Sequence, residues 1–278
     1  MTRTFAGRRR LIAILALAAA LLAAVPAYAD ATFRVLTYNI RTGLGSLDPS
    51  LDPYKDRKRK VDLAPIVAAI RSANPDVVAL QGVRGETQAK TLAAALGMHH
   101  VYHRHGPKYG KWWGLALLSR FPILASESLP VSHGEGNTRS DLLIRVEIGG
   151  KSVTIVDNHG DKDIKDGSNH KITMANLEKV TGPLVLLGDF NARPAWKRLK
   201  HVRKRLADAV EIAEEGGDAL KEHGTFREDR KLVDGKRIDY VFVDAKLIRV
   251  KRVGLIDNAH WDASDHIGVF ADLELKPE

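Results

Sequence analysis

The 278-residue sequence contains no cysteine, which excludes disulfides, thiolate metal ligands and cysteine nucleophiles. It has no internal repeat and no linker rich in proline, serine or glycine that would divide it into domains. Apolar residues make up 44% of the chain and aromatic residues 6%, a composition typical of a globular protein with an ample core. Lysine and arginine number 43 against 34 aspartate and glutamate, an excess that fits an anionic partner without establishing one.

An apolar run near the N-terminus has the pattern of an export signal. Four arginines precede Leu11–Val25, and the small-x-small sequence Ala27-Tyr28-Ala29 follows. A basic start, a short apolar stretch and such a cleavage motif predict a signal peptide over residues 1–29 and one mature domain over 30–278. The run is short for a bilayer, which needs about 20 apolar residues. We therefore expect an exported protein, periplasmic or secreted, without stable membrane insertion.

The mature chain alternates strand and helix patterns. Leu63–Ile70, Leu92–Leu96 and Leu199–Leu206 show apolar residues at helical spacing. Short apolar runs between them predict buried strands, and together they indicate an α/β layered fold with a mostly buried mixed sheet. The expected strands are Phe33–Ile40, Val77–Gln81, Gly114–Ser119, Leu142–Ile148, Val153–Asp157, Leu184–Gly188, Ile238–Val243 and Ile267–Leu275.

Several of these strands end in polar residues. Asn39 lies near the end of the first strand, His159 follows another, and Asp189 and Asn191 follow a third. Polar side chains placed where apolar strands stop tend to converge at one edge of a sheet, where α/β folds bind ligands. That edge is the candidate site.

Short motifs at these ends carry chemistry. Asp189 and Asn191 are two residues apart, so an extended segment points a water-activating carboxylate and an amide the same way, although an Asx turn explains them equally well. Asp265-His266 sets a metal-binding carboxylate beside a candidate base. Asp239 interrupts an apolar strand and needs a partner, for which a histidine is suited; a structural ion pair is an equal alternative.

The order of seven motifs favours the catalytic interpretations. They are Thr37-Tyr38-Asn39-Ile40, Pro75-Asp76-Val77-Val78-Ala79-Leu80-Gln81, Leu118-Ser119-Arg120-Phe121-Pro122, Asn158-His159, Gly188-Asp189-Phe190-Asn191, Arg237-Ile238-Asp239-Tyr240 and Ser264-Asp265-His266. With them the chain resembles the endonuclease/exonuclease/phosphatase superfamily, which includes deoxyribonuclease I. The resemblance implies a four-layer α/β sandwich of two packed mixed β-sheets flanked by helices. It also implies Mg²⁺-dependent (or Mn²⁺-dependent) hydrolysis of phosphate esters by an activated water.

Matched position by position, the resemblance assigns roles to the strand ends. Asn39 would help hold the metal and phosphate network. His159 would contact the scissile phosphate and could protonate the leaving group. Asp189 and Asn191 would position water and phosphoryl oxygens.

The C-terminal motifs supply three further roles by the same resemblance. Asp265 would lie at the metal, His266 would act as base or phosphate contact, and Asp239 would orient His266.

One position departs from the family pattern. After Leu80-Gln81 the family has a glutamate, its principal metal-ligating carboxylate, and this chain has Gly82. Glu86 could substitute only if the chain folds back after Gly82, which we do not expect. Three explanations stay open: a catalyst with another ligand, a degenerate binding protein, or a deliberate inactivating replacement.

Basic residues give weaker clues to the substrate. Residues 196–206 predict a basic helix and Lys55–Lys60 a basic loop, each of which fits a phosphate backbone or an ordinary solvated surface. Arg41 follows Asn39 closely, and its planar guanidinium is suited to a substrate phosphate.

Aromatic and histidine residues near position 100 leave two alternatives. Trp112 and Trp113 could stack on a base or belong to the core. His99, His100, His103 and His105 could form a transition-metal site, although imidazoles without carboxylate or cysteine partners are usually unliganded.

These patterns predict a monomeric, exported, metal-dependent phosphoric-ester hydrolase, a phosphodiesterase or nuclease with activity reduced by Gly82. The expected partner is a phosphate-ester substrate, with nucleic acid as one candidate. The alternative is a catalytically degenerate phosphate-ligand or nucleic-acid binding protein on the same fold.

Overall fold

The computed structural model describes residues 31–45, 61–106, 113–131, 139–221, 223–228, 231–232 and 236–277. The predicted signal peptide, the basic run Lys55–Lys60 and Trp112 lie outside the described residues. Within the described part of the chain, no helix is both long and apolar enough to span a membrane.

The first mixed sheet consists of β1 (Thr32–Asn39), β2 (Val77–Arg84), β3 (His99–Arg104), β4 (Trp113–Ser119), β13 (Ile248–Leu255) and β14 (Val269–Leu275). Its strand order is β13-β14-β1-β2-β4-β3. β1 and β2 run parallel, and the other neighbours are antiparallel.

The second mixed sheet consists of β5 (Ile123–Pro130), β6 (Ser140–Ile148), β7 (Lys151–His159), β8 (Leu184–Asp189), β9 (Ala207–Asp208) and β12 (Asp239–Val243). Its strand order is β5-β6-β7-β8-β12-β9, with β7 and β8 parallel. A separate pair joins β10 (Arg227–Glu228) to β11 (Lys231–Leu232).

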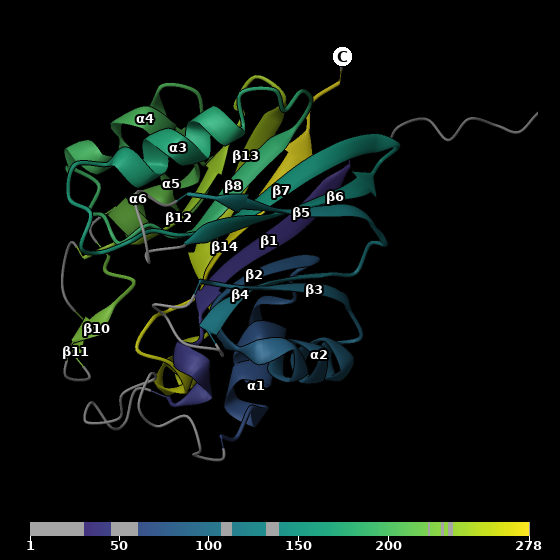
Figure 1. Cartoon of the computed structure of the whole chain (residues 1–278), viewed down its shortest axis with the longest axis vertical. Helices are drawn as coiled ribbons and strands as arrows, with labels where there is room; N and C mark the ends of the chain where they lie inside the picture. Colours follow the sequence, from purple (N-terminus) through teal and green to yellow (C-terminus); the bar gives the residue numbers. More distant parts are fainter. Residues whose placement is uncertain are drawn as a thin grey trace, which may run out of the picture.

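Helices cover the outer face of each sheet (Figure 1). α1 (Ala64–Ala73) and α2 (Gly85–Leu96) lie against the first sheet. On the opposite side, beyond the second sheet, lie α3 (Ser168–Asn176) and α4 (Lys200–Arg203), whereas α5 (Ala209–Ile212) and α6 (Gly217–Lys221) pack against the core between the sheets, next to β13. Three 3₁₀ turns complete the described elements: η1 (Arg41–Gly43), η3 (Lys197–Leu199) and η4 (Asn258–Ala263).

The pleat of the strands divides the core into three apolar layers. Val35 and Val185 face the layer between the two sheets. Their neighbours point the other way, Leu36 toward α1 and α2 and Leu186 toward α3 and α4. Successive residues of a strand face opposite sides, so continuous apolar strands fill both interfaces. The predicted four-layer α/β sandwich is confirmed.

Three strands of six to eight residues were not predicted, and each closes an edge of a sheet. β3 and β13 are the edges of the first sheet and β5 is an edge of the second. β5 has mostly exposed side chains and β3 mostly half-buried ones. Edge strands carry polar and charged residues that discourage further pairing, so they lack the apolar run that marks a buried strand.

The basic helix predicted over residues 196–206 is shorter in the structure, which has a helical segment over residues 197–203. Only η3 and the short α4 form there. Arg198, expected on a solvated face, is 5% exposed and donates to the carbonyls of Asn191 and Lys162. Arg205 likewise donates to two carbonyls just after α3. These bonds tie the segment to the neighbouring loops, so Arg198 does not belong to a solvated basic face.

Candidate active site at the common rim of the two sheets

Asp189 is the point at which the two sheets meet. The strand register sets it opposite His159 of β7 and opposite Asp239 of β12. Residues directly opposite on neighbouring strands have side chains on the same face, roughly 5 Å apart. Asn39, the last residue of β1, reaches over from the first sheet, and its Nδ2 donates to Oδ2 of Asp189 at 3.1 Å. All four side chains are buried.

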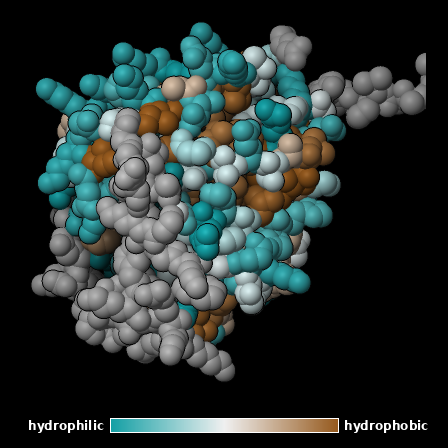
Figure 2. Space-filling model, in the orientation of Figure 1, coloured by the Kyte–Doolittle hydropathy of each residue, from teal (hydrophilic) through white to brown (hydrophobic). Residues whose placement is uncertain are grey.

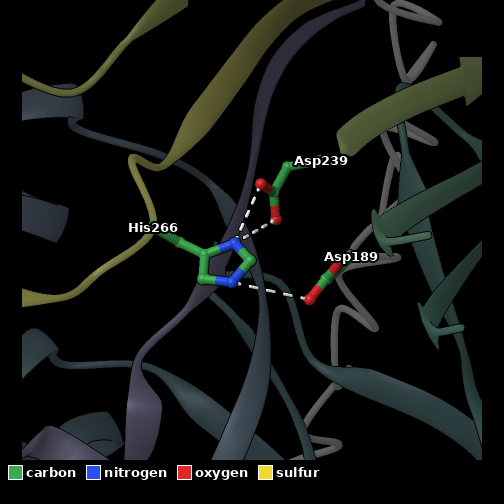
Figure 3. Close-up of side chains that lie close together, drawn as sticks. All are labelled: Asp189, Asp239 and His266. Atoms are coloured by element: carbon green, nitrogen blue, oxygen red, sulfur yellow. Dashed lines mark hydrogen bonds and ion pairs between the residues drawn. The ribbon is translucent and has the colours of Figure 1, made fainter. Parts of the chain in front are cut away.

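His266 lies between two carboxylates (Figure 3). Its Nδ1 is 3.0 Å from Oδ2 and 3.2 Å from Oδ1 of Asp239, and its Nε2 is 3.7 Å from Oδ2 of Asp189. Burial lowers the pKa of His266, but the charges of Asp239 and Asp189 outweigh burial and raise the pKa to about 10. The imidazole is therefore a cation at neutral pH, with its Nδ1–H directed at Asp239.

Thr225 fixes Asp239, and the sequence analysis missed it. Its hydroxyl donates to Oδ2 of Asp239 at 2.6 Å and accepts from the N–H groups of Ile238 and Asp239. The carbonyl of Thr225 accepts from the N–H of Ile267, next to His266. Only this tertiary pairing brings Thr225 to the site, so no local pattern in the sequence could have identified it.

Asp189 is a buried carboxylate with donors around both oxygens. Oδ1 accepts from the N–H of Asn191 at 2.9 Å, while Oδ2 faces Asn39 and lies 3.4 Å from Nε2 of His159. Burial raises the pKa of Asp189 to about 6, and protonated His266 opposes that rise. At neutral pH the group is ionised and is basic enough to take a proton from water.

Asn191 bonds to backbone on both sides. Its Nδ2 donates to the carbonyl of Gly160 at 3.0 Å, and its own carbonyl accepts from Arg198 at 2.9 Å. Its N–H bond to Asp189 is the Asx turn considered from the sequence. Asn191 therefore fixes the loop after β8 in this arrangement, and Arg198 supports it.

His159 lies in a pocket of rings at the end of β7. The ring centroids of Trp113 and His105 are 4.8 and 6.0 Å from its own, and Arg139 donates to its carbonyl at 3.2 Å. Burial, followed by the positive charge of Arg139, holds the pKa of His159 well below its ordinary value. The imidazole is neutral, and within the described residues its Nδ1 has no hydrogen-bond partner.

The histidines near position 100 divide between two environments. His105 is buried and packs on Trp113 and His159, so the site includes one member of the cluster. His100 instead pairs at 2.8 Å with Glu86, whose side chain is 60% exposed. Glu86 therefore does not replace the missing carboxylate. No group of three close metal ligands among the described residues includes any of these histidines.

The resemblance places a metal at Asp265. In the structure, the guanidinium of Arg41 faces this carboxylate. Nε of Arg41 lies 3.4 Å from Oδ2 of Asp265, and the N–H of Arg41 donates to Oδ1 of Asn39 at 3.1 Å. Gly82 sits at a bulge of β2 with φ of +69°, and a Cβ there would lie 2.8 Å from Oδ1 of Asn39. Mg²⁺ requires near-octahedral oxygen ligands. One carboxylate already facing a cation and one amide oxygen do not fit it.

A second group could hold a metal ion by distance alone. Asp189, Asp239 and His266 each offer a ligand atom, all within 4.8 Å of one another. These atoms also form the contacts drawn in Figure 3, with Nδ1–H of His266 directed at Asp239. A metal bound through that nitrogen would have to displace its proton.

Behind the rim lie two more buried carboxyl groups, Asp157 between the two sheets and Asp141 on the other face of the second sheet, next to Thr173 of α3. Nε2 of Gln81 points inward and donates to Oδ1 of Asp157 at 2.6 Å, and Nδ2 of Asn158 donates to Oδ1 of Asp141 at 2.5 Å. Burial raises the pKa of Asp157 well above its ordinary value and that of Asp141 to about 7. Burial therefore favours the protonated form of both acids behind the rim.

Comparison with known proteins agrees with this geometry. The profile of the Endonuclease/Exonuclease/phosphatase family matches residues 36–266. No curated protein matches the chain in sequence.

Solved structures share the fold at low sequence identity. An endonuclease/exonuclease/phosphatase from Beutenbergia cavernae is 22% identical, with 88% of this chain and 72% of that one covered and a TM-score of 0.67. A mannosyl-6-phosphatase from Bacteroides thetaiotaomicron is 22% identical, with 87% and 99% covered and a TM-score of 0.64. ANGEL2, a 2′,3′-cyclic phosphatase solved with adenosine-2′,3′-vanadate, is 13% identical, with 89% and 97% covered and a TM-score of 0.70.

Proposed function

Because the chain belongs to the endonuclease/exonuclease/phosphatase family, we propose that it hydrolyses phosphoric esters at the rim where Asp189, His159 and His266 meet. The observation that carries the proposal is the position of Asp189. Its carboxylate lies 3.4 Å from one imidazole and 3.7 Å from another, at the point where strands of both sheets end. An ionised, partly desolvated carboxylate beside a cation is suited to activate water against a phosphorus atom.

The proposed step gives each buried group one task. Asp189 takes a proton from water as the water oxygen bonds to phosphorus and the bond to the leaving oxygen breaks. His266, held protonated by Asp239, contacts the phosphoryl oxygens as charge develops there. The lowered pKa of His159 favours a hydrogen-bond donor over a proton donor, so solvent protonates the leaving alcohol.

The substrate we propose is a phosphodiester, with nucleic acid as the first candidate. The surface over α3 and α4 is mostly hydrophilic, with smaller hydrophobic patches (Figure 2). Just before α4, Trp196 is 43% exposed, with the guanidinium groups of Arg193 and Arg198 at 5.9 and 4.9 Å from its ring. An exposed aromatic ring beside the exposed Arg193 can stack on a base near a phosphate backbone, while the buried Arg198 supports the ring from below.

A salt titration tests this substrate class. The affinity for a short single-stranded oligonucleotide should fall steadily with rising salt, because bound phosphates release counterions. Trp196→Ala should weaken it further by about 1–3 kcal/mol. A binding curve that salt does not change would remove nucleic acid as the substrate.

Dependence on Mg²⁺ or Mn²⁺ stays a prediction from the resemblance. The donor set around Asn39 and Asp265 argues against it, and the step above uses only the chain's own groups. Turnover measured with each metal and with chelator tests that prediction.

We also propose that the protein is an exported monomer, periplasmic or secreted. The supporting observation is the basic and apolar N-terminal pattern followed by Ala27-Tyr28-Ala29. Mass spectrometry of protein recovered outside the cytoplasm should give an N-terminus at Asp30. Full-length protein retained in the cell would overturn export, and light scattering checks the monomer.

The experiment that tests hydrolysis uses His266→Ala on bis(p-nitrophenyl) phosphate and p-nitrophenyl phosphate. Removing the cation should lower kcat by about 10²–10³-fold. His99→Ala is the matched control, because His99 is exposed on β3. Equal turnover by His266→Ala and the control would overturn the proposed role of the site.

The second candidate is a phosphate-binding protein without turnover. Gly82 and the Arg41–Asp265 pair favour it, since the expected metal ligand is missing there. Tight binding of inorganic phosphate, with no hydrolysis of either ester, would support this candidate over the enzyme.

A further inference from the structure

We propose that Arg41 takes the place of the metal ion: its guanidinium, held on Asp265, supplies the positive charge that binds the phosphate group beside Asn39. This inference rests on the proposed function, because it names how the same site binds its substrate. The new element is that a residue of the chain, and not an exchangeable metal ion, supplies the positive charge.

The backbone after β1 is shaped to hold Arg41. Arg41 and Thr42 have φ of +44° and +56°, a left-handed conformation that is uncommon outside glycine. The reversal turns the N–H of Arg41 back to Oδ1 of Asn39 at 3.1 Å. Nη1 then donates to the carbonyl of Gly45 at 2.8 Å. Two bonds, one at the backbone and one at the guanidinium, fix Arg41 next to Asn39.

Asp265 completes the fixation of the guanidinium. Its Oδ2 lies 3.4 Å from Nε of Arg41, and its Oδ1 is 3.3 Å from the hydroxyl of Ser264, which donates to it. The side chains of Arg41 and Asp265 are 12% and 25% exposed, so the pair is mostly buried but reaches solvent. A guanidinium carries five N–H donors and a permanent positive charge, so in such a place it attracts a phosphate group.

The conformation of Gly82 leaves no room for a carboxylate. A Cβ at this residue would lie 2.8 Å from Oδ1 of Asn39 and 3.3 Å from both the N–H nitrogen of Arg41 and Nε1 of Trp113. Any side chain there would have to displace Asn39, whose amide also bonds Asp189. The bulge, the arginine turn and the glycine therefore form one consistent arrangement.

The positive charge of Arg41 also disfavours a metal ion at this place. A divalent cation between Asn39 and Asp265 would repel the adjacent guanidinium and would share a single carboxylate with it. With Arg41 in this place, an arriving phosphate group adds its negative charge where a permanent cation is already present. Because arginine stays protonated at every physiological pH, that cation cannot be removed by a chelator.

Calorimetric titration with inorganic phosphate tests the inference. The protein is treated with EDTA, and the titration is repeated with Mg²⁺ or Mn²⁺ added. We expect equal phosphate affinity in all three states. Arg41→Gln should weaken binding by about 10- to 100-fold, since it removes a charged hydrogen-bond donor, and Arg41→Lys should weaken it less. The matched control is Arg145→Gln, because Arg145 is exposed on β6.

Asp265→Asn distinguishes phosphate binding by Arg41 from phosphate binding through a metal ion, even if Arg41 variants fold poorly. The bonds of Arg41 to Asn39 and to the carbonyl of Gly45 remain in this variant, so a phosphate held by Arg41 should still bind in EDTA, with affinity changed by no more than a few-fold. A phosphate held through a metal should instead lose affinity, because the metal loses its carboxylate. Loss of phosphate binding in a folded Asp265→Asn, phosphate binding that appears only with Mg²⁺ or Mn²⁺, or unchanged affinity in a folded Arg41→Gln would each overturn the inference.

The outcomes also separate this inference from the proposed function. Chelator-resistant phosphate binding without hydrolysis of bis(p-nitrophenyl) phosphate would retain the role of Arg41 and reject the enzyme. Hydrolysis that EDTA abolishes and Mg²⁺ restores would retain the enzyme and reject the role of Arg41.

Discussion

The two sides of the rim are built in different ways. On the histidine–aspartate side, made of His159, Asp189, Asp239 and His266, three of the residues stand at aligned strand ends of the second sheet. Each side chain there is buried and bonded to another member or to Thr225. Regular pairing alone sets the spacing of the three aspartate and histidine residues on the strands.

The arginine side, made of Asn39, Arg41, Gly82 and Asp265, depends on irregular backbone instead. A left-handed turn carries Arg41, and a bulge with positive φ carries Gly82. Asn39 connects the two sides, because its Nδ2 donates a hydrogen bond to Oδ2 of Asp189. The comparison teaches that the cation of such a site can change by local changes in loops, while the acid–base groups stay fixed by the sheet.

The largest effect should come from breaking the histidine–aspartate side with Asp189→Asn. The amide keeps the shape but loses the base, so kcat should fall by about 10²–10⁴-fold. Asp218→Asn is the control, because its carboxylate is 96% exposed. Thermal unfolding of both variants checks that they are folded. Full activity in Asp189→Asn would show that the base lies elsewhere.

The arginine side is tested by Gly82→Glu, which adds the family's carboxylate. We expect lower stability by roughly 2–4 kcal/mol, from the left-handed φ and the close approach to Asn39, and no gain in Mg²⁺ affinity. Gly97→Ala, with a similar φ and open space around it, isolates the backbone strain. An active, Mg²⁺-binding Gly82→Glu of normal stability would mean that position 82 is a vacated metal ligand.

A smaller effect, on stability and not on activity, should come from the buried acids behind the rim, of which Asp141 is the one tested. The folded pKa of Asp141 is raised to about 7, so its stabilising contribution is present below pH about 4 and is lost as pH rises toward 7. Asp141→Asn should therefore gain about 1–3 kcal/mol over the wild type at pH 8 and nothing at pH 4. Denaturant unfolding at both pH values measures this, and an equal difference at the two would contradict it.

The smallest expected effect is the change of kcat with pH in the wild-type protein. Asp189 must be ionised, so activity should fall about tenfold per pH unit below pH about 6. His266 must be protonated, so activity should fall again as pH rises past about 10. Asp189→Asn should lose the acid limb of the profile. An activity that rises toward acid pH would contradict the assignment of the base.

Much of the fold could be predicted because apolar runs and polar strand ends mark the inner strands. Asn39, His159 and Asp189 were found in this way, from the points where such runs stop. β3, β5 and β13 could not be found, since edge strands lack a continuous apolar run.

The arginine side could be predicted only in part. Gly82 stood out against the family pattern, but its bulge and its distance from Asn39 depend on how β2 pairs with β4. Arg41 was named as a phosphate contact, yet its bond to Asp265 joins residues more than 200 positions apart. Thr225 and Arg198 act through backbone groups that no sequence motif reveals.

Hydrolysis of bis(p-nitrophenyl) phosphate in water enriched in heavy oxygen is the most direct test of the catalytic site. If water held by Asp189 attacks phosphorus, the phosphate product of the wild-type protein carries the heavy isotope and the released alcohol does not. Product formation by Asp189→Asn at the wild-type rate, or heavy oxygen in the alcohol, would contradict it.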